Sequence, residues 1–157
     1  MEFQHEQTPE INIVNDSKYD VPENIGEIVF YILKNHYHQL DVDLSIAFVN
    51  NEEIQNLNAS YLGYAKPTDV LSFSAKEVDP ETGRLYLGDI VISFPFVSEQ
   101  SKTMENSIHG ELSLMIIHGL LHLLDFDHDT KENKTEMWLA QEQALNALGI
   151  YLTNLPE

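Results

Sequence analysis

Three histidines at the end of a long apolar run have the spacing of metal ligands. They are His118, His122 and His128, at positions i, i+4 and i+10. Residues four apart on an α-helix project from the same face, so His118 and His122 can reach one ion. In a continuous helix His128 would lie about 9 Å farther along the axis. The helix must therefore break near Asp125 and return the chain toward the first two ligands.

The residue at the break and the residue after the first histidine can be compared with the pattern of a known class of metalloproteases. Metzincin proteases share the three-histidine spacing and place a glycine at the seventh position after the first ligand, where a left-handed turn forms. Asp125 occupies that position here, and aspartate is among the few residues enriched in left-handed backbone, so we predict a positive φ. The proteases also need a glutamate directly after the first histidine as general base. Gly119 stands there, which disfavours peptide hydrolysis by that mechanism.

The ligand chemistry points to zinc. The chain has no cysteine, so a transition-metal site must use imidazole and carboxylate groups. Three neutral imidazoles leave a fourth position for water, which is the open arrangement of a catalytic zinc. We therefore expect one zinc ion per chain, whose bound water serves as a catalytic group because the metal lowers its pKa to about 7.

Two other interpretations of the same segment are possible. The three histidines could be hydrogen-bonded core residues, although burying three polar rings without partners is costly. The acidic exit could instead be a calcium loop, because four residues match its ligand positions: Asp125, Asp127, Asp129 and Glu136. Thr130 replaces the glycine that such a loop requires at its sixth position. We favour a simpler role in which Asp127 or Asp129 orients a ligand imidazole.

Length and charge set broader limits. A chain of 157 residues predicts one domain, 1–157, with residues 1–9 as a loose N-terminal extension. The polar, acidic start lacks the features of a secretory signal, and the longest apolar run is too short to span a bilayer, so we expect a cytoplasmic protein without membrane contact. The net charge of −18 repels polyanions. Four basic residues nevertheless gather in the central segment: Lys66, Lys76, Arg84 and Lys102.

The pattern of apolar residues predicts an α+β fold, with one small, four-stranded mixed sheet packed against helices. Alternating or β-branched runs indicate strands at 10–15, 44–49, 68–73 and 86–93. Helical spacing indicates helices at 22–38, 51–61, 97–104, 108–124 and 130–147. Pro22 is expected to open the first helix, Asn50 or Asn51 to cap the second, and Gly149 to stop the last. The metal helix falls in the C-terminal half.

Three segments together carry a family resemblance. They are Leu57-Asn58 with Pro67–Phe73, then Leu87–Ser93, and finally His118–Leu123 closing with Asp127-His128. In this order they resemble the YbeY family, which comprises metal-dependent endoribonucleases that act on single-stranded RNA in ribosomal RNA maturation and ribosome quality control. The resemblance covers about residues 10–148. It implies single-stranded or ribosomal RNA as the substrate, and ribosomal proteins or assembly factors as further partners.

The chain departs from the family pattern at two places. The family often has Gly-Tyr where Asp125-Phe126 stands here. Many members also carry an arginine implicated in activity just after the aromatic residue that precedes the Thr-Asp strand, whereas Leu62 follows Tyr61 here. A guanidinium would suit a phosphodiester or its transition state, so its absence bears on catalytic strength. Lys66 could supply a point charge nearby.

The resemblance leaves the catalytic route open. A zinc-bound hydroxide could attack the phosphodiester, or the metal could polarise a phosphoryl oxygen while the ribose 2′-hydroxyl attacks. Asp69 is the candidate proton acceptor, although a strand-entry aspartate often only binds nearby backbone. Lys66, Lys76 and Arg84 are the candidate RNA-binding residues. The alternative function is a ribosome-associated binding module with a mainly structural zinc and weak or no cleavage.

Overall fold

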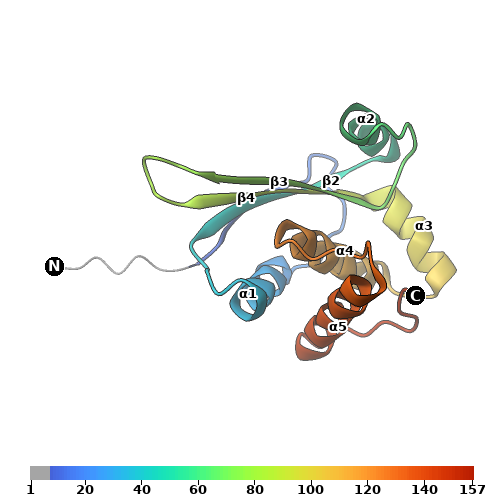
Figure 1. Cartoon of the computed structure of the whole chain (residues 1–157). Coiled ribbons are helices and arrows are strands. Elements are labelled where there is room, and N and C mark those ends of the chain that lie inside the picture. The colour runs from blue at the N-terminus through green and yellow to red at the C-terminus, as the bar shows by residue number, and fades with distance from the viewer. Residues whose placement is uncertain (1–7) are drawn as a thin grey trace.

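Four strands form one mixed sheet in the order β1-β2-β4-β3 (Figure 1). The computed structural model describes residues 8–157, so most of the predicted N-terminal extension lies outside the described residues. The strands are β1 (Glu10–Val14), β2 (Val42–Val49), β3 (Val70–Val78) and β4 (Leu85–Ser93). β2 runs parallel to both β1 and β4, and β3 pairs with β4 in an antiparallel hairpin. The predicted four-stranded mixed sheet is confirmed.

Five helices surround this sheet within the described residues: α1 (Ile25–His36), α2 (Asn51–Leu62), α3 (Phe94–Met104), α4 (Ile108–Leu123) and α5 (Lys131–Ala147). In Figure 1, α1, α4 and α5 lie below the sheet and α2 lies above it. α4 packs against β3 and β4 and also against α1, α3 and α5. The helix that carries the first two histidines is therefore the central helix of the lower layer.

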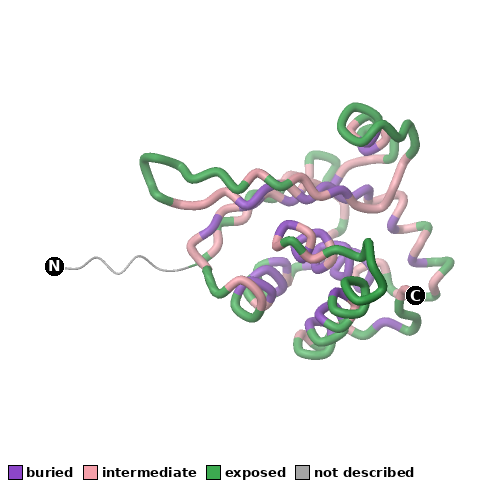
Figure 2. Tube along the Cα trace, in the orientation of Figure 1, coloured by how far each residue is buried: buried purple, intermediate pink, exposed green. Residues whose placement is uncertain are grey.

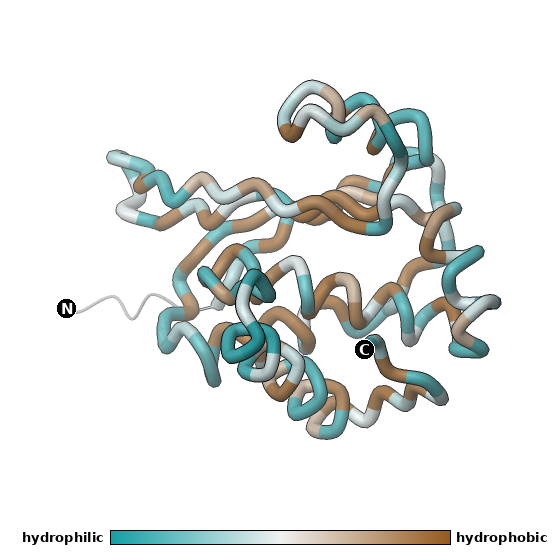
Figure 3. The backbone as a smooth tube through the Cα atoms, turned by 45° about the vertical axis from the view of Figure 1, so that its right-hand side comes forward, coloured by the Kyte–Doolittle hydropathy of each residue, from teal (hydrophilic) through white to brown (hydrophobic). Residues whose placement is uncertain are grey.

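The burial pattern explains these layers (Figure 2). Residues of β2 alternate between buried and half-buried, as expected for a strand covered mainly on one face. α4 is different, because apolar residues project from every side of it and twelve of its sixteen residues are buried. A helix that is apolar all round belongs in a protein interior. Figure 3 shows the same contrast between the apolar inner segments and the hydrophilic outer loops.

A second, smaller cluster lies on the other face of the sheet. Ile54 of α2 packs there with Leu71 of β3 and Val91 of β4. A full capping box at Asn50 and Glu53 begins α2, which confirms Asn50 as its cap. The loop after α2 leads directly into β3, so this helix positions the strand entry at Asp69.

The helix and strand boundaries differ from the predicted ones at a few ends. α1 begins at Ile25 after Asn24, so Pro22 lies outside the helix and the prediction that it opens the helix was wrong. α3 begins three residues earlier than predicted, because the Ser93 hydroxyl accepts a hydrogen bond from the backbone of Phe96 and caps it. Gly149 follows α5 with φ of 68°, as a helix stop requires. None of the helices in residues 8–157 has the length and apolar character needed to cross a bilayer.

Gly119 lets α4 approach the sheet closely. A Cβ at this position would lie 2.7 Å from the Cγ2 atom of Ile90 and 3.2 Å from the Ser72 hydroxyl oxygen. The same hydroxyl donates a 2.9 Å hydrogen bond to the Gly119 carbonyl, so helix and strand are joined at this point. A methyl group here would force two closely packed elements apart.

We predict that Gly119→Ala lowers the free energy of unfolding by about 1–2 kcal/mol, because the overpacking outweighs the better helix propensity of alanine. Gly26→Ala is the matched control, since a Cβ there meets nothing within 4 Å and Gly26 is also helical. That control should be neutral or stabilising by up to about 1 kcal/mol. Urea denaturation of both variants measures the difference, and equal stabilisation by the two alanines would contradict the packing argument.

Candidate metal centre

The structure brings the three predicted ligands together. His118 and His122 project from the last two turns of α4, and His128 lies in the segment between α4 and α5. One ring nitrogen from each histidine lies within 4.8 Å of the others. The Nε2 atoms of His118 and His122 are 3.1 Å apart. The three rings therefore form a group that can hold a metal ion.

A left-handed turn returns the chain to the site. α4 ends at Leu123, and Asp125 adopts φ of 72°. The backbone N–H of Asp125 donates to the carbonyl of His122, and that of Phe126 donates to the carbonyl of Leu121. These two bonds satisfy carbonyl groups at the end of the helix while reversing the chain. The positive φ predicted for Asp125 is confirmed.

Hydrogen bonds orient two of the rings. The Nδ1 of His122 lies 2.9 Å from the carbonyl oxygen of Phe126, which can only accept, so Nδ1 carries the proton. The Nδ1 of His118 lies 2.6 Å from Oε1 of Gln141 on α5 and is held as a donor in the same way. In the neutral rings this leaves the Nε2 lone pairs free, and they face each other. This is the arrangement of ligand and orienting acceptor that metal sites use.

The predicted orienting role of Asp127 or Asp129 was wrong. The Asp127 carboxylate accepts from the backbone N–H of His128. Asp129 accepts from the backbone of Thr130 and from the side chain of Asn133. These aspartates therefore shape the turn into α5, and the ring acceptors come from Gln141 and the Phe126 carbonyl instead. Gln141 is 3% exposed, and a buried glutamine within the apolar face of α5 was the signal that could have revealed it.

The electrostatics of the site favour a cation. Burial lowers the pKa of both His118 and His122, and the neighbouring histidines lower it further. Both rings are therefore held neutral, with two lone pairs directed at each other across 3.1 Å. A divalent ion converts that repulsion into attraction. Tetrahedral zinc with bonds of 2.0–2.1 Å needs ligand nitrogens about 3.4 Å apart, so the donor set fits and the 3.1 Å between the Nε2 atoms of His118 and His122 is close to that distance.

Asp69 faces the histidines across a cavity of about 440 Å³. β3 and its entry contribute one wall, which includes Thr68, Asp69 and Ser72, and the three histidines contribute the other. One Asp69 carboxylate oxygen accepts from the backbone N–H of Val70 at 2.8 Å and from the Thr68 hydroxyl at 3.3 Å. Asp69 therefore binds its own strand entry, as one of the two interpretations expected, and it also lines the cavity, while its role as proton acceptor stays a prediction.

The three candidate RNA-binding residues are not gathered in one place. Lys76 forms an ion pair with Asp125 and so lies beside the turn that follows α4. The ammonium group of Lys66 lies 5.8 Å from the ring centroid of Tyr64. Arg84 lies at the opposite end of the hairpin from Asp69, where it donates to the Asp43 carboxylate and to the carbonyls of Thr8 and Val42.

A family model described as Endoribonuclease YbeY matches residues 5–149. The chain belongs to the YbeY family. A YbeY endoribonuclease from Halalkalibacterium halodurans is 42% identical over 116 residues, which cover 69% of this chain and 73% of the relative. One from Staphylococcus aureus is 35% identical over 144 residues, covering 88% of this chain and 91% of the relative. The resemblance inferred from the sequence motifs is confirmed.

A solved structure supports the fold of this YbeY family member. A solution structure of a protein from Thermotoga maritima matches with a TM-score of 0.59 at 27% identity, covering 90% of this chain and 92% of that one. Leu62, which stands where many family members carry an arginine, is the last residue of α2 and is exposed. Its neighbour Tyr61 packs edge-on against Phe73 of β3. This departure therefore leaves the fold intact and changes only the surface.

We predict that Asp125→Gly is neutral or stabilising by up to about 1 kcal/mol, since glycine has no Cβ penalty at positive φ. The lost ion pair with Lys76 has little effect, because both side chains are well exposed. Asp125→Val should destabilise the protein and weaken metal retention. Denaturation midpoints and metal content of the two variants check this. A glycine variant clearly less stable than the wild type would show that the carboxylate itself matters.

Gln141 provides a test of ring orientation. Gln141→Leu keeps the size of the side chain but removes the acceptor for His118, so metal affinity should fall by about 10–100-fold. Gln143→Leu is the matched control, because Gln143 lies exposed on the same helix. Competition with a chromophoric chelator measures both affinities. Equal affinities in the two variants would mean that His118 needs no orienting partner.

Proposed function

We propose that this protein is a zinc-dependent endoribonuclease that cuts single-stranded RNA during ribosomal RNA maturation, with His118, His122 and His128 as the metal ligands. The observation that carries the proposal is the convergence of three ring nitrogens at one point, on neutral rings with two of them held by acceptors. Membership of a family whose curated relatives are named endoribonucleases supports RNA as the substrate.

When bound, the metal would supply Lewis-acid chemistry, which polarises a phosphodiester and makes water more acidic. The chain supplies the remaining groups. Asp69 lines the same cavity as the ligands, and one of its oxygens is used by Thr68 and Val70. The second oxygen is free of hydrogen bonds from residues 8–157, so it can take a proton from the attacking hydroxyl group or water. The bonds to the first oxygen hold the carboxylate in place for this role.

Lys76 and Lys66 are proposed to contact the RNA backbone. Lys76 lies beside the turn that leads to His128, and Lys66 lies in the loop that leads to Asp69. Arg84 has a structural role in this proposal, because its guanidinium joins β2 to the β3–β4 hairpin at the distant end of the sheet. With two nearby cations and a net charge of −18, binding of the phosphate backbone alone should be weak.

The decisive experiment combines metal content with cleavage. Protein purified without chelators should contain about one equivalent of zinc by elemental analysis and should cut a single-stranded RNA oligonucleotide. His122→Ala should lose both the metal and at least about a hundredfold in rate, because it removes a ligand from the middle of the site.

His109→Ala is the matched control, since His109 lies on the same helix but forms its contacts with Asp20. It should keep metal and activity. Zinc below about a tenth of an equivalent, without uptake of added zinc, would contradict the metal assignment. Full zinc content without cleavage would instead favour a binding module with a structural metal.

A further inference from the structure

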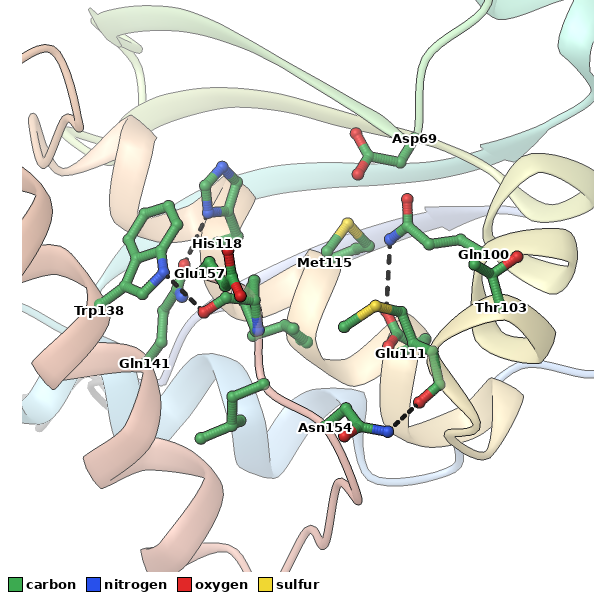
Figure 4. A pocket seen from close by; sticks show the side chains of 14 residues that line it. Asp69, Gln100, Thr103, Glu111, Met115, His118, Trp138, Gln141, Asn154 and Glu157 are labelled. Carbon is green, nitrogen blue, oxygen red and sulfur yellow. Dashed lines mark hydrogen bonds between the residues drawn. The ribbon is translucent and has the colours of Figure 1, made fainter.

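A second, larger cavity begins at the metal centre and extends away from it. Its volume is about 760 Å³, and it lies between α3, α4, α5 and the C-terminal segment (Figure 4). Asp69 and His118 line both this cavity and the histidine cavity. Figure 4 shows His118 and Gln100 on opposite sides, with Met115 between them. A molecule bound at the histidines could therefore extend directly into this space.

The walls of the cavity suit a flat, mostly apolar group. The side chains of Met104, Leu114, Met115 and Leu155 line it, and Trp138 contributes its ring next to His118. Thioethers and apolar carbons make favourable contacts with aromatic rings. The volume is within the range of about 300–1,000 Å³ that is typical of small-molecule sites.

Polar groups at the far side are fixed by a buried carboxylate. Glu111 is 2% exposed and accepts hydrogen bonds from Asn106 at 2.6 Å and from Nε2 of Gln100 at 3.3 Å. This bond fixes which way the Gln100 amide points. The other N–H of that amide and its Oε1 have no partner among the described side chains and backbone groups. An adjacent donor and acceptor of this kind can pair with the edge of a nucleobase.

A further hydrogen-bond donor is available near the metal centre. Gln141 lines the cavity and uses Oε1 to hold His118. Its Nε2 has no acceptor within residues 8–157, and it remains accessible, because these residues contain no buried side-chain nitrogen or oxygen without a hydrogen-bond partner. A ligand that offers an acceptor at this point would accept a hydrogen bond from this donor.

The charge of the cavity excludes a phosphate as its occupant. Three carboxylates line it, those of Asp69, Glu111 and Glu157, and the described lining contains no lysine or arginine. A phosphate would meet repulsion here, whereas an uncharged ring with hydrogen-bonding edges would not. The cavity therefore fits the part of a nucleotide that carries no charge.

We propose that this cavity is a nucleobase subsite, which takes one unstacked base of the RNA strand whose phosphodiester lies at the histidines. This inference rests on the proposed function and adds to it. A base can enter only after it leaves its neighbours, which a paired strand resists, so the subsite contributes to the choice of single-stranded RNA. It also supplies binding that does not depend on phosphate contacts, which are scarce on this acidic protein.

The probe for this site is an uncharged nucleoside. Trp138 is the only tryptophan of the chain and lines the cavity, so its fluorescence reports entry of a base. Titration of the purified protein with adenosine, guanosine, cytidine and uridine should give saturable quenching, with affinities that differ between the bases by about threefold or more. Free ribose should give none. Because nucleosides carry no phosphodiester, this measurement is independent of RNA cleavage.

Two variants connect the signal to the cavity. Thr103 lines it from the exposed side of α3, so Thr103→Phe should obstruct it and weaken nucleoside binding by about tenfold. Thr135→Phe is the matched control, because Thr135 is equally an exposed helical threonine whose hydroxyl donates to the carbonyl four residues earlier. Gln100→Met should keep binding but reduce the differences between the bases to less than about twofold.

The outcomes separate the two proposals. Quenching by ribose, or equal affinities in Thr103→Phe and Thr135→Phe, would overturn the nucleobase subsite. Cleavage of RNA without nucleoside binding would overturn the subsite and leave the proposed function in place. Nucleoside binding by a protein that carries zinc but cuts no RNA would confirm base recognition in the cavity and overturn the nuclease proposal.

Discussion

The close contact between α4 and the sheet is the constraint on which the metal centre depends. Gly119 removes the side chain that would separate helix from strand, and the Ser72 hydroxyl binds its carbonyl. His118 and His122 lie on either side of this point. Because α4 is buried among other helices as well, the two imidazoles are fixed by the protein core and not by a surface loop.

The other parts of the site are positioned around this fixed helix by the turn that follows it and by the elements that pack near it. The turn at Asp125 brings His128 back, and the Phe126 carbonyl within that turn orients His122. α5 then docks on α4 and supplies Gln141 to His118. β3 enters on the other side and brings Asp69 to face the ligands. The site therefore lies where three elements meet, which agrees with the common placement of ligand cavities between packed elements.

The sequence predicted what depends on local geometry. The ligand set follows from helix periodicity, and the reversal at Asp125 follows from the need to bring His128 back to that helix. Gln141 and the Phe126 carbonyl were missed, since ring acceptors depend on how α5 and the turn pack. Gln141 gave one signal, because it sits beside Ala140 and Ala144 on the buried face of α5. The ion pairs of Lys76 and Arg84 involve partners more than 40 residues away, which spacing along the chain cannot reveal.

The hydrogen bond between Gln141 and His118 couples the last helix to the metal. A ligand that binds only the folded arrangement stabilises it in proportion to its own affinity and concentration. Metal bound to a correctly oriented His118 therefore also favours the docked position of α5. Conversely, transient undocking of α5 frees the ring that it orients and weakens its hold on the ion. Undocking of α5 and dissociation of the metal are therefore coupled equilibria, so a change in one changes the other.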